Sequence, residues 1–180
     1  MLSVMKRSII VFLLLFLSLA PIGFAHTSAQ SATVENAYQL AYPGMLPDSP
    51  LYKLKVLRDK IVLFLIKDPQ KQVENYLLQA DKGIAMVPML IEKGKIDLAK
   101  ETAFKAEHHF TELTFVYKKT ETKPDTKTYK KLTRAALMHQ EVLGSAVKKL
   151  GKEDQKEFHR VIDFSKTNLE ELQRILTKKD

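Results

Sequence analysis

The residues best suited to bind a metal ion lie in one short segment, which contains Glu107, His108, His109 and Glu112. On a helix, His108 and Glu112 are four residues apart and share a face, and imidazole is the commonest metal ligand in proteins. A further ligand would have to come from another helix, through His139 or His159. The bundle motif for two metals needs a Glu followed three residues later by His, and no Glu of this chain is so placed.

We therefore expect no cofactor and no resident metal. If a metal does bind, the expected ligands are His108, His109 and Glu112. The alternative is that these side chains are solvated or cap helices.

A second group, His159, Asp163 and Ser165, resembles the residue types of a hydrolase. At 100° per residue, however, Ser165 lies about 200° around a helix from Asp163, so the three cannot converge locally. The chain also lacks Gly-x-Ser-x-Gly, a phosphate-binding loop and His-Glu-x-x-His, and it has no cysteine to supply a thiol nucleophile. We expect a protein that is not an enzyme and has no catalytic residue.

The elements that would position these residues are all predicted to be helices, over about 51–66, 69–93, 97–117, 127–150 and 154–177. Apolar residues recur at spacings of four and three, and no stretch alternates with period two. Asp68-Pro69 predicts one helix start, Asp48 or Ser49 is the expected cap of the first helix, and Gly94 predicts a left-handed stop. The pattern predicts an all-α fold, an elongated antiparallel bundle of two helical hairpins preceded by a shorter amphipathic helix.

Inward positions follow from the same spacing. For the two C-terminal helices they include Leu132, Ala136, Val142 or Leu143, Ala146, Phe158, Ile162, Ser165, Leu169, Leu172 and Leu176.

The N-terminal segment predicts export. Lys6 and Arg7 precede an almost wholly apolar run, Ile9–Ala20, and small residues at Ala25 and Ala29 offer cleavage points. This is the organisation of a secretory signal peptide over residues 1–25. Because the run is shorter than the roughly 20 residues of a membrane span, cleavage after Ala25 is favoured over retention as an anchor.

We expect an extracellular or cell-envelope-associated protein, anchored to the membrane if the segment is not cleaved. Residues 26–47 are predicted to be a flexible linker, and residues 48–180 a single helical domain.

Composition narrows the possible partners. The chain has 29 Lys and Arg against 21 Asp and Glu, and without Lys6 and Arg7 it has 27 against 21, a net charge of +6. An exported basic protein meets acidic wall polymers and anionic lipids more readily than nucleic acid, and we expect no nucleic-acid partner. The alternative is that the lysines are solvated helix surface, since they are interleaved with acidic residues. With no cysteine there are no disulfides, so buried apolar surface must supply the stability.

One block, YPGMLPDSPLYKLKVLRDKIVLFLIKDPQK, spans Tyr42 to Lys71 and contains the pattern LPxSPxYxLKxxxxKIxLxxxxDPxK over residues 46–71. It resembles a family of exported or extracytoplasmic bacterial and archaeal helical proteins classified as a domain of unknown function. The likeness continues more loosely to about Leu113, with no claim on the last two helices. The resemblance implies an envelope location, but it implies no activity, cofactor or catalytic residue.

The helix over about 51–66 carries the expected interaction residues, which are Tyr52, Lys53, Lys55, Arg58 and Lys60. Its apolar side comprises Leu54, Leu57, Ile61, Phe64 and Leu65. A basic amphipathic helix can lie on a membrane surface, or it can cover a bundle with its lysines in water. The sequence favours packing on the bundle.

The function we expect is that of a non-enzymatic interaction module at the cell envelope, with an envelope protein as partner. The alternative is a salt-sensitive binder of anionic lipid or acidic wall polymer through the basic amphipathic helix.

Overall fold

The computed structural model describes residues 38–178, within which it contains five helices and no strand. The helices are α2 (Tyr52–Leu65), α3 (Pro69–Glu92), α4 (Ile96–Thr120), α5 (Thr126–Val147) and α6 (Lys152–Thr177). The all-α prediction is confirmed, and the predicted bounds agree with these to within about three residues.

Local signals account for several of the helix ends. The Asp68 carboxylate caps α3 by accepting a hydrogen bond from the backbone N–H of Lys71 at 2.9 Å, with Pro69 at the first helical position. Gly94 follows α3 with a φ of +70°, the left-handed conformation that favours glycine after a helix. α5 ends at Val147 rather than near residue 150, because Lys149 and Leu150 close tighter turns onto the carbonyls of Ala146 and Val147.

The predicted cap of the first helix is wrong. The capping position of α2 is Leu51, which makes no side-chain cap. Backbone bonds from Ser49 to Leu46 and from Tyr52 to Ser49 already close this turn. The Asp48 carboxylate is therefore free to accept from Lys93 and Lys95, each at 3.0 Å, and ties the entry to α2 to the turn between α3 and α4.

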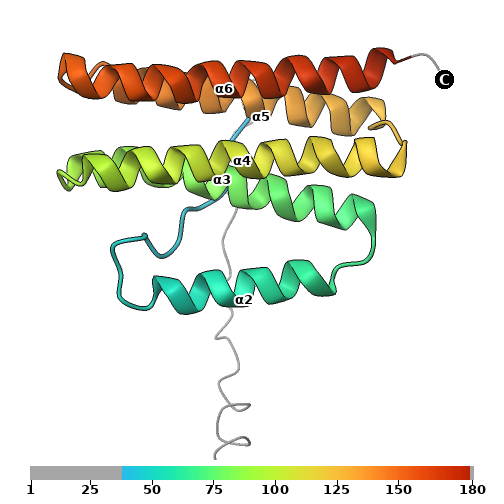
Figure 1. Ribbon diagram of the computed structural model, residues 1–180, viewed down its shortest axis with the longest axis horizontal. Coiled ribbons are helices and arrows are strands. Elements are labelled where there is room, and N and C mark those ends of the chain that lie inside the picture. The colour runs from blue at the N-terminus through green and yellow to red at the C-terminus, as the bar shows by residue number, and fades with distance from the viewer. Residues whose placement is uncertain (1–37, 179–180) are drawn as a thin grey trace, which may run out of the picture. The chain divides into compact units, whose positions relative to one another are not determined.

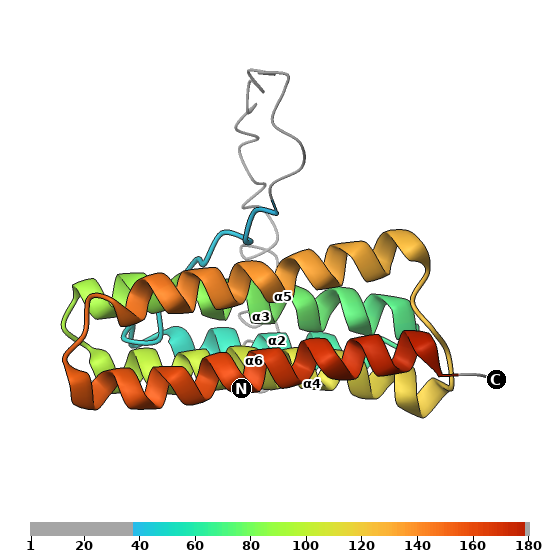
Figure 2. The same ribbon diagram turned by 90° about the horizontal axis from the view of Figure 1, so that it is seen from above.

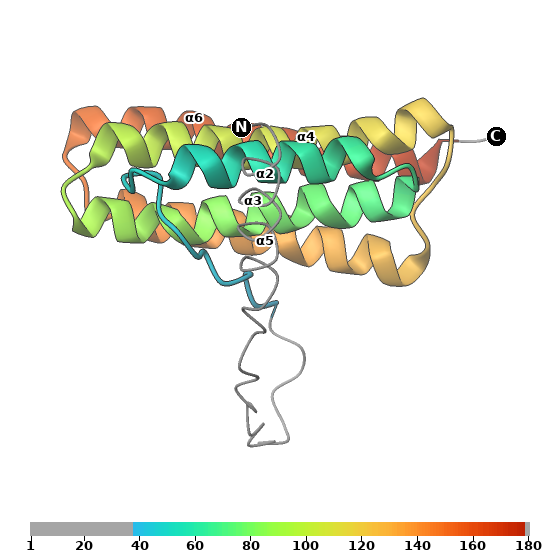
Figure 3. The same cartoon turned by 90° about the horizontal axis from the view of Figure 1, so that it is seen from below.

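The four long helices form two hairpins, α3–α4 and α5–α6 (Figure 1). The hairpins stack so that α3 lies beside α5 and α4 beside α6, as the view from above also shows (Figure 2). α2 lies on the face of the α3–α4 hairpin that points away from α5 and α6, over the line where α3 and α4 meet (Figure 3).

The core divides into two apolar clusters along the length of the hairpins. The first contains Val73, Leu77, Phe110, Leu113, Leu132 and Leu172 among others. The second contains Ile84, Leu90, Ala103, Leu143, Phe158 and Val161 among others. Each cluster contains residues from all four long helices, so both hairpins must be in place for either cluster to be shielded from water.

Part of the predicted linker lies within the described residues. Over residues 38–47, Tyr38 packs against the first cluster, while Leu40 and Leu46 pack against the second. The predicted signal peptide, residues 1–25, lies outside the described residues. Within residues 38–178, no helix has the length and apolar character needed to cross a membrane.

Candidate functional site

The side of α2 that faces the bundle is its polar side. Tyr52, Lys55, Val56, Asp59 and Leu63 are half-buried and recur at spacings of three and four, which places them on one face. No residue of α2 is fully buried. The sequence favours packing of this helix on the bundle with its lysines in water. α2 does lie against the α3–α4 hairpin, but its apolar side faces solvent and Lys55 lies beneath the helix. The surface beneath explains why: α3 and α4 turn their apolar stripes into the core and present polar side chains, including Gln79, Lys82 and Lys105, towards α2.

The opposite side of α2 is apolar and exposed. We call it the outer apolar face, and it consists of Leu54, Leu57, Ile61, Phe64 and Leu65. Phe64 is 77% exposed and Leu57 is 55% exposed. At 100° per residue these five side chains fall within an arc of about 100°. Single exposed apolar residues are ordinary, whereas these five adjoin one another on one helix, which makes this face the candidate interaction surface.

Three lysines follow one edge of the outer apolar face. Lys53 and Lys60 are seven residues apart on α2 and so lie close to one line along the helix, and Lys67 follows just beyond its C-terminal end. All three are exposed, and within residues 38–178 none takes part in an ion pair. The ammonium of Lys67 lies 5.3 Å from the centre of the Phe64 ring, so charge and apolar surface adjoin directly.

The five predicted interaction residues divide between the two sides of α2. Tyr52 and Lys55 face the bundle, where the Lys55 ammonium lies 5.1 Å from the centre of the Tyr52 ring and 3.6 Å from Asp59. Lys53, Arg58 and Lys60 face solvent. Only the last three are placed to meet an external partner.

The predicted metal ligands lie on α4 but face different surroundings. His108 is exposed, with Nε2 3.4 Å from the Glu112 carboxylate. His109 turns towards α2; burial, with the positive charges of His108 and Lys55, lowers its pKa to about 4. His139 lies elsewhere, in the core, and His159 is exposed. Among the described residues there is no group of three or more His, Asp or Glu arranged to hold a metal ion.

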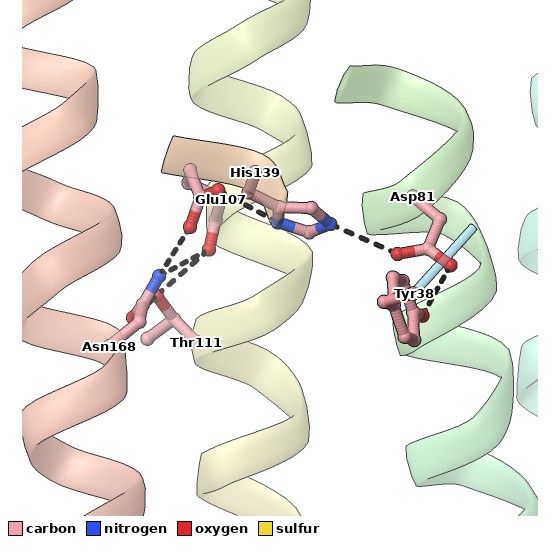
Figure 4. Close-up of polar contacts among 6 residues, drawn as sticks. All are labelled: Tyr38, Asp81, Glu107, Thr111, His139 and Asn168. Carbon is pink, nitrogen blue, oxygen red and sulfur yellow. Dashed lines mark hydrogen bonds and ion pairs between the residues drawn. The ribbon is translucent and has the colours of Figure 1, made fainter. Parts of the chain in front are cut away.

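The main feature that sequence reasoning missed is a buried polar layer between the two apolar clusters (Figure 4). It takes one residue from each long helix, and its members are Asp81, Glu107, His139 and Asn168. The His139 ring lies between two carboxylates, with Nδ1 3.0 Å from Glu107 and Nε2 3.0 Å from Asp81. Such a layer holds its charges only because each is hydrogen-bonded.

The two carboxylates have further donors. The Tyr38 hydroxyl donates to Asp81 at 2.7 Å, which joins the segment before α2 to the layer. The Asn168 amide donates to the Glu107 carboxylate at 3.1 Å and to the Glu107 carbonyl at 2.9 Å, and its own oxygen accepts from Thr111 at 2.8 Å. Every charged group in the layer is therefore hydrogen-bonded (Figure 4).

Electrostatics keep His139 charged. Burial alone would lower the pKa of His139, but the hydrogen bonds to Asp81 and Glu107, with the charges of both carboxylates, outweigh it and raise the pKa to about 9. Burial of Tyr38, together with its hydrogen bond to Asp81, raises the pKa of the Tyr38 hydroxyl above its ordinary value. The layer is buried in the core, where its hydrogen bonds hold the four long helices in position relative to one another.

A sequence signal for His139 exists. The predicted stripe of α5 passes from Ala136 to Leu143 with no apolar residue at 139 or 140, where one turn of the helix must still face the core. The gap shows that a polar residue is buried there. Its partners come from three other helices, and spacing along one helix cannot identify them.

Fold and surface together define a small all-α protein with one amphipathic helix on the outside of two packed hairpins. The family model described as "Domain of unknown function (DUF5667)" matches residues 44–153, and the chain belongs to that family. The match starts inside the Tyr42–Lys71 block and continues through α5 into α6, further than the likeness to about Leu113 noticed in the sequence. The comparisons find no match among curated proteins or solved structures.

Proposed function

We propose that this chain is a non-enzymatic, exported interaction protein that binds an anionic membrane surface through the outer apolar face of α2. The observation that carries the proposal is the orientation of α2, which turns its apolar residues to solvent and its polar side to the bundle. Water-exposed leucine and phenylalanine side chains gain about 1.5–3 kcal/mol each when fully transferred to an apolar environment.

Charge complementarity selects anionic lipid as the partner. Lys53, Lys60 and Lys67 border the outer apolar face, where their long stems can follow the apolar surface while their ammonium groups reach the head groups. A lysine near an anionic surface contributes about 1 kcal/mol, so three lysines contribute about 3 kcal/mol at low salt. That is roughly a 100-fold gain in binding.

The size of the surface also favours a membrane over a protein. α2 has 14 residues and is therefore about 21 Å long and about 10 Å wide. One face of it covers roughly 200 Å², whereas a stable protein interface buries about 800 Å² on each partner. A flat bilayer needs no matching groove, so a short helix is sufficient.

Cosedimentation with vesicles tests this proposal. The mature protein should bind vesicles that contain phosphatidylglycerol, bind neutral phosphatidylcholine vesicles far more weakly, and lose most of its binding between 50 mM and 500 mM salt, because the charge term is screened. Leu57→Glu should reduce binding at least tenfold. Leu137→Glu is the matched control, because Leu137 lies on α5, has the same residue type and is 51% exposed, against 55% for Leu57.

Two results would count against membrane binding. One is a wild-type protein that stays in solution with anionic vesicles at low salt. The other is equal loss of binding in both leucine variants, which would mean that general charge, and not α2, drives association. A protein that ignores vesicles yet cross-links to one envelope protein through α2 would favour the protein partner instead.

A further inference from the structure

A cavity of about 330 Å³ lies beneath α2, between that helix and the α3–α4 hairpin. This volume is at the lower end of the range of small-molecule sites, about 300–1,000 Å³. Its apolar walls come from both sides, through Val56 and Leu63 of α2 and Met86 and Leu98 of the hairpin. The space is partly open to solvent and its exposed walls are mainly apolar, and beside a helix that buries none of its own residues it is large enough to accept a small ligand.

The base of the cavity is shaped by small residues. Gly83 and Ala106 both line it, and a Cβ atom at position 83 would lie 2.6 Å from the Ala106 Cβ. α3 and α4 therefore approach each other closely at this point.

The cavity also carries positive charge that its own carboxylates do not fully neutralise. Lys105 is paired with Glu101 at 2.5 Å, and Lys55 lies 3.6 Å from Asp59. Lys82 is half-buried, lines the cavity and has no carboxylate partner within residues 38–178. Burial lowers the pKa of Lys55, and the nearby positive charge of Lys82 adds to that effect against the attraction of Asp59. The two ammonium groups thus share a site that would be stabilised by an added anion.

Two buried polar atoms at the same cavity have no hydrogen-bond partner among residues 38–178. They are the Nδ1 atom of His109 and the Oδ1 atom of Asn75, and both residues line the space. Buried polar atoms are nearly always hydrogen-bonded, so each such exception requires an explanation. A neutral His109 with its proton on Nδ1 can donate one hydrogen bond to an oxygen of a bound anion.

We propose that this cavity binds a small amphipathic anion, with a carboxylate head at Lys82 and His109 and an apolar body along Val56, Leu63 and Met86. The bound anion would lie against the inner side of α2, whereas membrane binding uses the outer apolar face, and of the residues assigned to membrane binding only Lys60 also lines the cavity. The two proposals can therefore fail independently.

Titration calorimetry with decanoate, below its micelle-forming concentration, tests the proposal. The wild-type protein should bind one decanoate per chain, and decanol, which has the same chain length without the charge, should bind at least tenfold more weakly. Lys82→Gln should weaken decanoate binding about tenfold. Lys152→Gln removes an equal charge from α6, where the lysine is exposed and has no ion pair in the described chain, and should change nothing.

Filling the space gives an independent test. Val56→Trp should abolish decanoate binding, whereas Leu57→Trp, one residue further along on the outer side, should retain it. The proposal is overturned if the wild-type protein shows no one-to-one binding, or if the two tryptophan variants bind equally, which would place decanoate on the outer apolar face. Lys82→Gln changes α3 and leaves the side chains of α2 that face the bundle unaltered. Its effect on decanoate binding therefore remains informative even if Val56→Trp unfolds the protein.

Discussion

His139 and Glu107 lie 3.0 Å apart, Nδ1 to Oε1, at the level where the two apolar clusters of the core meet. Asp81 approaches the other ring nitrogen at the same distance, and Asn168 holds Glu107 from the fourth helix. A slide of one helix by a turn would leave a charge buried without a partner, which costs several kcal/mol. The layer therefore sets the register of four helices whose apolar stripes alone would tolerate shifts.

Removal of His139 should be strongly destabilising. His139→Leu retains the volume of the side chain approximately, but leaves Asp81 and Glu107 without the cation between them. Loss of one partner of a buried ionic group typically costs about 3–5 kcal/mol. Guanidinium unfolding followed by circular dichroism should show this loss as a lower midpoint.

Ser165→Ala is the control for this variant. Ser165 is buried on α6, but its hydroxyl has no hydrogen-bond partner in the part of the chain that the structure describes, so its removal should change stability by less than about 1 kcal/mol. If His139→Leu costs no more than Ser165→Ala, the polar layer contributes nothing to stability.

Stability should fall as the pH rises from about 6.5 to about 9. The folded-state pKa of His139, about 9, lies above its ordinary value of 6.5, so the folded protein binds more protons in this interval. The stabilisation is fully present below pH 6.5 and is lost as the pH passes through 9. A shift of this size corresponds to about 3 kcal/mol.

Unfolding midpoints measured across this interval test the prediction. The alkaline decline should disappear in His139→Leu and persist in His159→Gln, because His159 is exposed. A wild-type protein with equal stability at pH 6.5 and pH 9 would contradict a charged, doubly bonded His139.

His109 acts in the opposite direction, because its lowered pKa of about 4 removes stability only as the pH falls below 6.5.

The sequence predicts most of the fold because the relevant signals are local. Asp68-Pro69 and Gly94 mark the ends of α3 through caps that involve only neighbouring residues. The spacing of apolar residues identifies the inward faces of the long helices, although α6 is rotated enough to bury Val161 and Asn168. These features depend on one helix at a time.

What the sequence could not predict depends on pairs of elements. The pattern of α2 identifies its apolar side, but which side faces the bundle depends on the polar surface that α3 and α4 present. His139 similarly needs Asp81 and Glu107, which are 58 and 32 residues away along the chain. The spacing within α5 signals a polar residue at position 139, but neither the partners of His139 nor the orientation of α2 can be identified from the spacing within one segment.

Gly83 should be intolerant of a methyl group. Gly83→Ala would place its Cβ 2.6 Å from the Ala106 Cβ, so the two helices must separate, at a cost of about 1–3 kcal/mol. Gly144 is the matched control, since it lies within α5 and a Cβ there would meet no described residue within 4 Å. Gly144→Ala should stabilise the protein by about 0.5–1 kcal/mol, because alanine favours the helix. Thermal melts of both variants that shift in the same direction would contradict close packing at Gly83.

Contact between the outer apolar face of α2 and a membrane can be tested by fluorescence, because the chain contains no tryptophan. Phe64→Trp places one reporter on this face, and Leu137→Trp places one on an exposed site of α5. Vesicles that contain phosphatidylglycerol and lipids brominated along the acyl chain quench only a side chain that enters the apolar region.

Anionic vesicles should shift the emission of the Phe64→Trp protein to shorter wavelength and brominated lipid should quench it, whereas the Leu137→Trp protein should show neither change. Both effects should weaken as salt is raised, because the lysines along the face lose their attraction for the lipid. Emission from Phe64→Trp that is unchanged by vesicles, or quenched no more than that of Leu137→Trp, would contradict membrane contact through this face.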